Sequence, residues 1–305
     1  ISRGLHRRLL SGAVSISRNI LYHISPIIAT NFSCDRLFCF RYPILFVKYT
    51  FSGEKPESAL YPPPFHAIIE KNGRKEQSNI MKFNFIESAK EHILVVAHRG
   101  VFGGNIPCNT IVAYEIALKQ GADVIEIDVE MSKDGKLYIM HPGAEEHQLS
   151  CMDKLRHMTS EEIARQRYLN YDRLYTQFGV NTLDEVLETF RGRCYINVDK
   201  FWGHPKEIYQ AIKRHQMTDQ VVVKSAPSEE VFQILEELAP DIPYLPVVRD
   251  THSFHERLKR SAINYIGAEV LFRNDDVEVA SPEFTERMHR DGKLVWVNSI
   301  IYNYK

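Results

Sequence analysis

Residues 121–141 read GADVIEIDVEMSKDGKLYIMH and contain two apolar runs of strand length, at 124–128 and 137–140. Only about eight residues join them, whereas a helical crossover between parallel strands needs about a dozen or more. Two interpretations are open at this point. The runs form either a hairpin, as the local pattern indicates, or consecutive parallel strands joined without a helix.

Six further runs of strand length lie outside this stretch, at 93–97, 195–198, 221–223, 244–248, 269–272 and 294–297. Most of them are separated by segments with helical spacing. Two helical faces are formed by Leu183, Val186, Leu187 and Phe190, and by Val231, Ile234, Leu235 and Leu238. Typical helix starts occur at Thr182 with Glu185 and at Ser281-Pro282. Alternating strands and helices, with eight strands in all, predict a parallel (β/α)8 barrel of the TIM type.

The composition is that of an ordinary globular protein, with 305 residues, 44% apolar content and a net charge of -1. The absence of a basic excess argues against a nucleic-acid partner. The five cysteines are odd in number and lack metal-ligand spacing, so neither a disulfide framework nor a zinc site is indicated. This cysteine usage favours a reducing compartment, and we expect a cytoplasmic protein.

The first 50 residues differ from the rest in charge. Seven basic residues against one acid give this segment +6, which leaves -7 for residues 51–305. Charges interrupt its apolar runs before the roughly 18 residues of a membrane span, so no transmembrane segment is predicted. We expect residues 1–80 to be a disordered or non-native extension; the alternatives are a targeting segment or a membrane-surface element.

The barrel domain is predicted to span 81–305, beginning near Met81. The chain starts at Ile1 rather than at Met, in keeping with a non-native leading segment, and it stops at Lys305, shortly after the eighth strand. We therefore expect the last helix of the barrel to be missing.

Polar residues follow or interrupt the apolar strands at one end: His98-Arg99, Glu126, Asp128, His141, Asp199-Lys200 and Lys224. In a parallel barrel these positions meet at the carboxyl-terminal mouth, where active sites of this architecture lie. Glu126 and Asp128 are two residues apart and share one face of a strand. Together with Asp199 they predict an oxygen-rich site for one divalent cation, Mg²⁺ or Ca²⁺.

The remaining polar residues suit phosphate chemistry. Arg99, Lys200 and Lys224 would bring positive charge to the same rim, and His98 and His141 would act as general acid and base. Each residue also has a plainer structural interpretation, such as a surface ion pair for Asp199-Lys200. The functional interpretation is favoured because charges are costly within apolar strands and all of them lie at the same end.

Six motifs occur in a fixed order: His98-Arg99-Gly100, Pro107-Cys108-Asn109-Thr110, Gly121-Ala122-Asp123, Glu126-Ile127-Asp128-Val129, Ser132-Lys133-Asp134-Gly135 and His141. They resemble the signature of the glycerophosphodiester phosphodiesterases, and the resemblance covers roughly Ile93 to Asn298. It implies a barrel whose second and third strands lack a standard helical link, followed by an insertion at residues 142–181.

The resemblance also implies roles for the site residues. His98 and His141 would be the acid–base pair, Arg99 a phosphate ligand, and Glu126 and Asp128 metal ligands. Asp199 falls where the family usually has a metal-binding Glu, Lys200 matches the following Lys, and Trp296 with Asn298 resembles the substrate-binding end of the last strand. Two positions depart from the family: Cys108 replaces a usual Glu, and Pro142 replaces a usual Asp.

The predicted function is metal-dependent hydrolysis of a small-molecule glycerophosphodiester to glycerol phosphate and an alcohol. Two alternatives remain: a metal-independent phospholipase-like lyase, and a non-enzymatic ligand-binding barrel. The sequence does not predict the oligomeric state. A further hypothesis is that Glu145 or Glu146 compensates for the acid missing at Pro142 and orients a polar group of the site.

Overall fold

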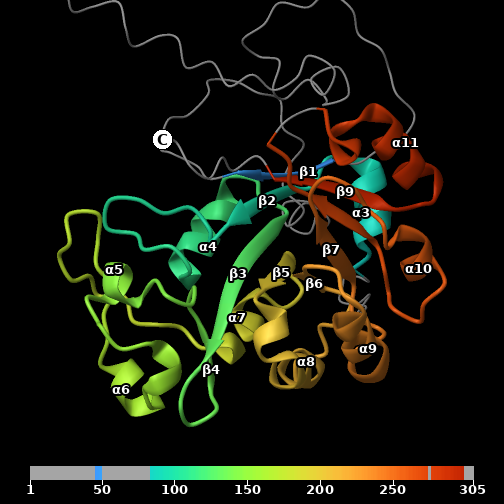
Figure 1. The fold of residues 1–305 in the computed structure, drawn as a ribbon. Coiled ribbons are helices and arrows are strands. Elements are labelled where there is room, and N and C mark those ends of the chain that lie inside the picture. The colour runs from blue at the N-terminus through green and yellow to red at the C-terminus, as the bar shows by residue number, and fades with distance from the viewer. Residues whose placement is uncertain (1–44, 50–82, 274–275, 299–305) are drawn as a thin grey trace, which may run out of the picture.

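The computed structural model describes residues 45–49, 83–273 and 276–298, and its centre is a barrel of parallel strands (Figure 1). Each barrel strand pairs in parallel with two neighbours, in the order β2-β1-β9-β8-β7-β6-β5-β3, and β3 pairs back to β2. The strands are β1 (Leu45–Tyr49), β2 (Val95–His98), β3 (Val124–Met131), β5 (Tyr195–Asp199), β6 (Val221–Ser225), β7 (Tyr244–Val248), β8 (Gly267–Val270) and β9 (Leu294–Asn298). The predicted barrel fold is therefore confirmed.

The strand β4 (Leu137–Ile139) is the partner of a hairpin. It runs antiparallel to the end of β3, with Val129 opposite Ile139 and Met131 opposite Leu137. The prediction that residues 137–140 form one of the eight parallel strands is wrong. A tight turn reverses the chain, because the Ser132 amide donates to the Lys136 carbonyl at 2.8 Å. The hairpin interpretation is thus confirmed.

The eighth place in the barrel is taken by β1. Its backbone lies between β2 and β9, with Val47 in register with Val95 and Leu45 with Val295. These five residues fall within the leading segment 1–80, which the sequence places outside the barrel, so the expectation fails for them. Their backbone fills an opening between two strand edges that would otherwise stay unpaired. The rest of residues 1–80, and the end of the chain where the last helix was expected to be missing, lie outside the described residues.

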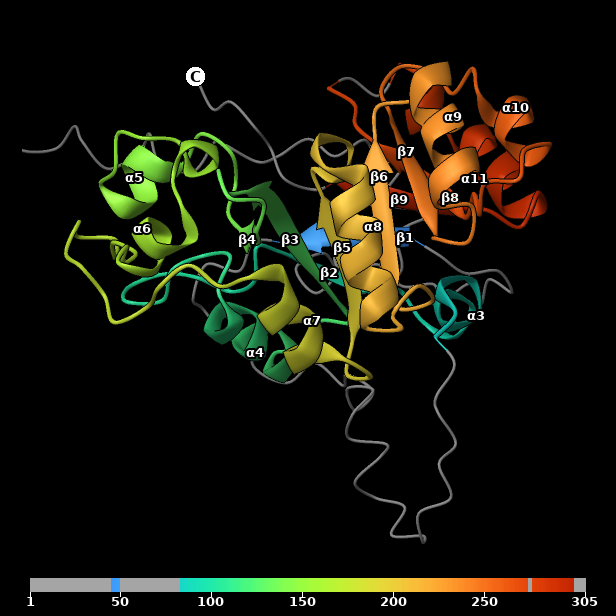
Figure 2. The same ribbon diagram turned by 90° about the horizontal axis from the view of Figure 1, so that it is seen from below.

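Helices surround the barrel (Figure 2). They are α4 (Ile111–Lys119), α7 (Leu183–Phe190), α8 (Pro205–Arg214), α9 (Glu229–Leu238), α10 (His255–Lys259) and α11 (Pro282–Arg290), with short 3₁₀ turns η3 (Phe201–Gly203) and η4 (Glu278–Ala280). The helix α3 (Phe85–Glu91) lies at the opposite end from the mouth, where the ring of Phe85 packs 4.0 Å from that of Tyr195 at the start of β5. Among the described residues, no helix combines the length and apolar character that a bilayer crossing requires.

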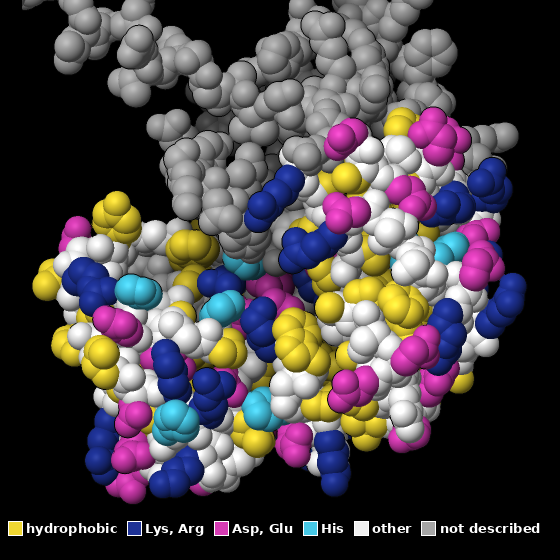
Figure 3. Space-filling model, viewed as in Figure 1, with side chains coloured by type: hydrophobic (Ala, Val, Ile, Leu, Met, Phe, Trp, Pro, Cys, Tyr) yellow, Lys and Arg dark blue, Asp and Glu magenta, His cyan; other side chains and the backbone are white. Residues whose placement is uncertain are grey.

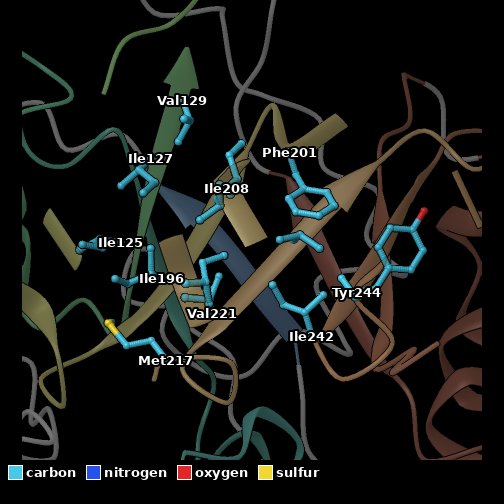
Figure 4. Packing of buried hydrophobic residues seen from close by; sticks show 14 of the residues in the cluster. Ile125, Ile127, Val129, Ile196, Phe201, Ile208, Met217, Val221, Ile242 and Tyr244 are labelled. Carbon is cyan, nitrogen blue, oxygen red and sulfur yellow. The ribbon is translucent and has the colours of Figure 1, made fainter. Parts of the chain in front are cut away.

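Side chains of β3 alternate between the two faces of the strand, with apolar residues on the outer face and acidic residues on the face towards the barrel interior. Ile125, Ile127 and Val129 point away from the barrel axis into the main core against the outer helices (Figure 4). The residues between them, Glu126 and Asp128, are therefore on the opposite, inward face. Both are fully buried, so the sequence pattern of this strand places two carboxylates inside the barrel.

The predicted helix starts are present. Thr182 and Glu185 form a capping box at α7, and Ser281 caps α11 ahead of Pro282. All four residues predicted on the α7 face are buried, whereas the α9 face is rotated: Phe232 and Leu235 are its buried residues. Phe232 decides this rotation because its ring contacts those of Tyr244 and Phe254.

β8 begins at Gly267, two residues before the predicted start at 269. Gly267 has no Cβ, and this permits a close approach to β9: a Cβ there would lie 2.3 Å from the Leu294 carbonyl oxygen. Residues 142–181 form a separate lobe beside the barrel, here called the insertion lobe (Figure 1). It contains α5 (Glu145–Leu149), η2 (Leu155–His157) and α6 (Ser160–Ala164), which pack around an apolar cluster of their own.

Candidate active site

Three carboxylates meet at the mouth of the barrel. Glu126 and Asp128 come from the inward face of β3, and Asp199 is the last residue of β5. Asp128 and Asp199 are register partners in the sheet. One oxygen from each of the three residues lies within 4.8 Å of the others. The predicted metal ligands are therefore brought together by the parallel alignment of two adjacent strands.

The electrostatics of this cluster fit a divalent cation. Burial, followed by the charge of Glu126, raises the pKa of Asp128, while the charge of Arg99 opposes that rise. Among the described residues, Oδ1 of Asp128 is buried without a hydrogen-bond partner, and the Lys200 Nζ lies 3.9 Å away from it. Carboxylate oxygens are the ligands that Mg²⁺ and Ca²⁺ prefer. The donor set present therefore suits such an ion.

Arg99 touches both carboxylates of β3. Its Nε lies 2.8 Å from Oδ2 of Asp128, and its backbone amide donates to Oε2 of Glu126 at 3.0 Å. The chain can make this contact because it turns sharply after β2, with positive φ at Arg99 (57°) and Gly100 (76°). Gly100 is required there because a Cβ would lie 2.6 Å from the carbonyl carbon of Ala113.

The two predicted acid–base residues both lie beside the carboxylates. His98 ends β2 and is only 7% exposed, with its Nε2 3.9 Å from Oε2 of Glu126. His141 follows β4, and the preceding residue, Met140, donates its amide to the Asp128 carbonyl at 3.0 Å. The hairpin thus carries His141 back to the level of Asp128.

Lys200 adds a positive charge at the rim. Its Nζ lies 2.8 Å from Oδ2 of Asp199. Burial acts to lower the pKa of Lys200, but the neighbouring Asp199 outweighs it and the pKa is raised. The ammonium therefore stays charged next to the carboxylates. Charged side chains of both signs and histidines gather in the hollow between the insertion lobe and the barrel (Figure 3).

Lys224 and Trp296 lie together inside the barrel, with an acid that the sequence did not single out. The Lys224 Nζ is 2.6 Å from Oε2 of Glu269 and 4.5 Å from the centre of the Trp296 ring. Asn298 donates to the other oxygen of Glu269 at 3.2 Å. The Lys224 ammonium is therefore already neutralised by a carboxylate, so its contact with phosphate stays a prediction. The sequence feature that could have identified Glu269 is that it is an acidic residue within an apolar strand.

Asn109 is a second residue that sequence reasoning missed. Its side-chain amide donates to Oδ2 of Asp128 at 2.9 Å, and its carbonyl oxygen accepts from the Tyr114 hydroxyl at 2.9 Å. It adopts a left-handed backbone with φ 56° and is fully buried. Asn109 therefore orients Asp128. The sequence feature that could have identified Asn109 is its place in the Pro107–Thr110 motif, one residue before the N-cap of α4.

Two other acids near the site have structural partners. The carboxylate of Glu145 is buried and accepts from the Leu155 amide at 2.9 Å, so it holds the insertion lobe together. The other oxygen of Glu145 lies 3.8 Å from the Lys154 Nζ of the same lobe, and Glu146 is exposed, so the hypothesis that one of them orients a group of the site stays a prediction. Glu130, the third inward acid of β3, pairs with His204 at 2.9 Å.

Comparison with known proteins agrees with this geometry. Residues 98–298 match the model of the glycerophosphoryl diester phosphodiesterase family. The chain belongs to this family. A glycerophosphodiester phosphodiesterase of Bacillus subtilis (strain 168) is 30% identical over 173 residues, which is 50% of this chain and 58% of that protein. One from Bacillus altitudinis is 34% identical over 142 residues, covering 43% and 57%. The chain thus spans a little over half the length of these family members.

Two solved structures share the fold of this phosphodiesterase-family chain. A glycerophosphoryl diester phosphodiesterase from Parabacteroides distasonis has a TM-score of 0.59 and 21% identity, covering 67% of this chain and 70% of that one. A phosphodiesterase from Oleispira antarctica, in complex with the product sn-glycerol-3-phosphate, has a TM-score of 0.56 and 22% identity, covering 68% and 85%. At these identities the likeness establishes the barrel fold.

Proposed function

We propose that the chain hydrolyses glycerophosphodiesters to glycerol phosphate and an alcohol, with the help of one divalent cation. The observation that carries this proposal is the cluster of Glu126, Asp128 and Asp199, whose oxygens lie within 4.8 Å of one another. His98 and Arg99 lie directly beside it. Family membership and the named activity of the relatives support the same reaction.

The charges of the cluster balance only when an ion and a substrate are both bound. Three carboxylates against Arg99 and Lys200 leave a charge of -1, which a divalent ion converts to +1, and this matches the single negative charge of a phosphodiester. Glu126, Asp128 and Asp199 would hold Mg²⁺ or Ca²⁺. When bound, the ion would neutralise the negative charge that develops on a nonbridging phosphate oxygen. Arg99 and Lys200 would contact the remaining phosphate oxygens.

His98 and His141 would move the protons. One imidazole accepts a proton from the attacking hydroxyl, which belongs either to water or to the 2-hydroxyl of glycerol. The other imidazole donates a proton to the departing alcohol. Attack by the glycerol hydroxyl would form a cyclic phosphate first, and water would then open it. One histidine lies at the end of β2 and the other follows β4, so the two imidazoles come from different elements.

The compartment is proposed to be the reducing cytoplasm. Cys108, Cys151 and Cys194 are free thiols among the described residues, which is typical of proteins kept under reducing conditions. The substrate is proposed to be a small molecule, because Glu126 and Asp128 are fully buried inside the barrel.

The test is release of glycerol phosphate from a panel of glycerophosphodiesters, with Mg²⁺, with Ca²⁺ and with a chelator. We expect His98→Ala and His141→Ala each to lower turnover by about 10² to 10⁴-fold. His157→Ala is the matched control, because this histidine is 60% exposed on the insertion lobe. Full activity in the chelator would instead favour the metal-independent lyase, and no turnover of any diester would favour a binding protein.

A further inference from the structure

The exposed large apolar side chains of the described residues lie in the segments that follow the barrel strands β2 and β5 and in the insertion lobe. They are Phe102 after β2, Met152, Tyr171, Leu174 and Tyr175 in the insertion lobe, and Trp202 after β5, with exposed fractions from 42% to 87%. We call this set the apolar rim. Hydrophobic side chains protrude along the outer edge of the insertion lobe in Figure 3. Phe102 and Tyr171 of this set line the same cavity, and exposed large apolar side chains that gather on a surface are typical of a binding site.

A cavity of about 170 Å³ leads inward from the apolar rim. It lies between the loop after β2 and the insertion lobe. Its apolar lining residues are Phe102, Ile106, Leu169 and Tyr171, and its polar ones include His147, Gln148 and Asn170. The two walls are joined by a hydrogen bond of 3.1 Å from the Tyr171 amide to the Gly104 carbonyl. An apolar cavity of about 150 Å³ accommodates a benzene ring, so this one has room for part of an aliphatic chain.

Cys108 connects the cavity with the carboxylate site. It lines the cavity, and its Sγ accepts a hydrogen bond from Nε2 of Gln148 at 3.2 Å. Burial raises the pKa of the Cys108 thiol to about 11, and the nearby charges of Arg99 and Asp128 also act on it. The thiol therefore stays neutral and behaves as a small apolar group. The wall that Cys108 forms is therefore uncharged, although Arg99 and Asp128 lie close enough to act on it.

We infer that the substrate is an amphiphilic phosphodiester, whose phosphate binds at Glu126, Asp128 and Asp199 while its single aliphatic chain lies in the cavity and along the apolar rim. The inference rests on the proposed phosphodiesterase function. An amphiphile fits both surfaces because Cys108, which lines the cavity, directly precedes Asn109, whose side-chain amide donates to Asp128 in the charged site. The rim loop itself has no net charge, since Asp172 and Arg173 are its only charged residues between 168 and 178. A loop without net charge would not attract a charged macromolecule electrostatically.

The test compares two substrates with the same headgroup, glycerophosphocholine and a short-chain lysophosphatidylcholine below its critical micelle concentration. Choline release reports both reactions. We expect wild-type kcat/KM to be at least about tenfold higher for the substrate with the chain. The double variant Tyr171→Ser/Leu174→Ser should lower this ratio by about tenfold. Both side chains are mostly exposed, so their loss should leave the fold intact.

Asp172→Ser is the matched control, because it changes an exposed polar residue of the same loop and should keep the wild-type ratio. Equal kcat/KM for the two substrates in wild type, or an unchanged ratio in the double variant, would overturn the inference while the proposed function stands. If neither substrate is hydrolysed, the proposed function fails. The inference is then tested by measuring the affinity of both compounds by calorimetry. Tighter binding of lysophosphatidylcholine than of glycerophosphocholine in wild type, with this difference lost in the double variant, supports the inference. Equal affinities in wild type refute it.

Discussion

Replacing Asn109 with glycine removes the group that orients Asp128. The Asn109 amide donates to Oδ2 of Asp128 at 2.9 Å and holds the Tyr114 hydroxyl at the same distance. Glycine is the appropriate replacement because position 109 has φ 56°, which alanine would adopt only with strain. The backbone hydrogen bond from residue 109 to the Arg99 carbonyl, at 3.0 Å, can persist in the variant.

The magnitude follows from the two strongest of the three hydrogen bonds that the Asn109 side chain makes, since the third, from the Asp128 amide, is long at 3.4 Å. A bond to a charged group contributes about 1.5–3 kcal/mol, and a buried hydroxyl left without a partner costs about 1–3 kcal/mol. Tyr114 is fully buried, so its hydroxyl has no access to bulk water. We expect the free energy of unfolding of Asn109→Gly to fall by about 2–5 kcal/mol. Since Asn109 orients a proposed metal ligand, metal affinity should also fall about 10–100-fold.

The assay is thermal unfolding of the full chain over a titration of Mg²⁺ or Ca²⁺, because an ion that binds the native state raises Tm. In Asn109→Gly, Tm without metal should be lower, and the half-maximal shift should require about 10–100-fold more metal. Tyr114→Phe is the control: it keeps the Asn109 amide on Asp128, so stability should fall with little change in metal response. A wild-type metal response in Asn109→Gly would refute the role given to Asn109.

Burial and the charges of His255 and Arg287 lower the pKa of His252 to about 4 from 6.5. The folded state resists protonation, so the stability present above pH 6.5 should decline towards pH 4, by up to about 3 kcal/mol; urea unfolding of His252→Gln should show a weaker decline. Gly100→Ala should disrupt the turn at Arg99, because its Cβ would lie 2.6 Å from Ala113; loss of the metal-dependent Tm shift would show this. Thr182→Ala removes the cap of α7 and should cost about 1 kcal/mol in denaturant unfolding, while an unchanged midpoint would mean that the cap is dispensable.

The strands of the barrel could be predicted from sequence where apolar runs are bounded by helices, but two features could not. The run Leu45–Tyr49 resembles any short apolar segment, and only its pairing with β2 and β9, far away in sequence, makes it a barrel strand. For β4, the count of eight strands favoured a parallel arrangement while the short turn favoured a hairpin. The local turn decided the outcome because eight residues cannot contain a helical crossover.

The carboxylate cluster was predictable because its positions follow from strand geometry alone. Glu126 and Asp128 share a face, and Asp199 ends the adjacent parallel strand in register. Asn109 and Glu269 were missed because their importance depends on contacts made across the fold, with Asp128 and Lys224 respectively. A sequence pattern reports which face a residue occupies, but it does not report which partner that residue meets.

Equilibrium binding of Mg²⁺ and Ca²⁺ to the full chain, with glycerol phosphate release recorded in the same samples, tests the central claim most directly. We predict one ion per chain, hydrolysis in proportion to its occupancy, and loss of both in Asp199→Asn. Asp153→Asn, which changes a carboxylate that is 72% exposed on the insertion lobe, should keep both. Full-rate hydrolysis by the ion-free chain, or unchanged ion binding by Asp199→Asn, would contradict the claim.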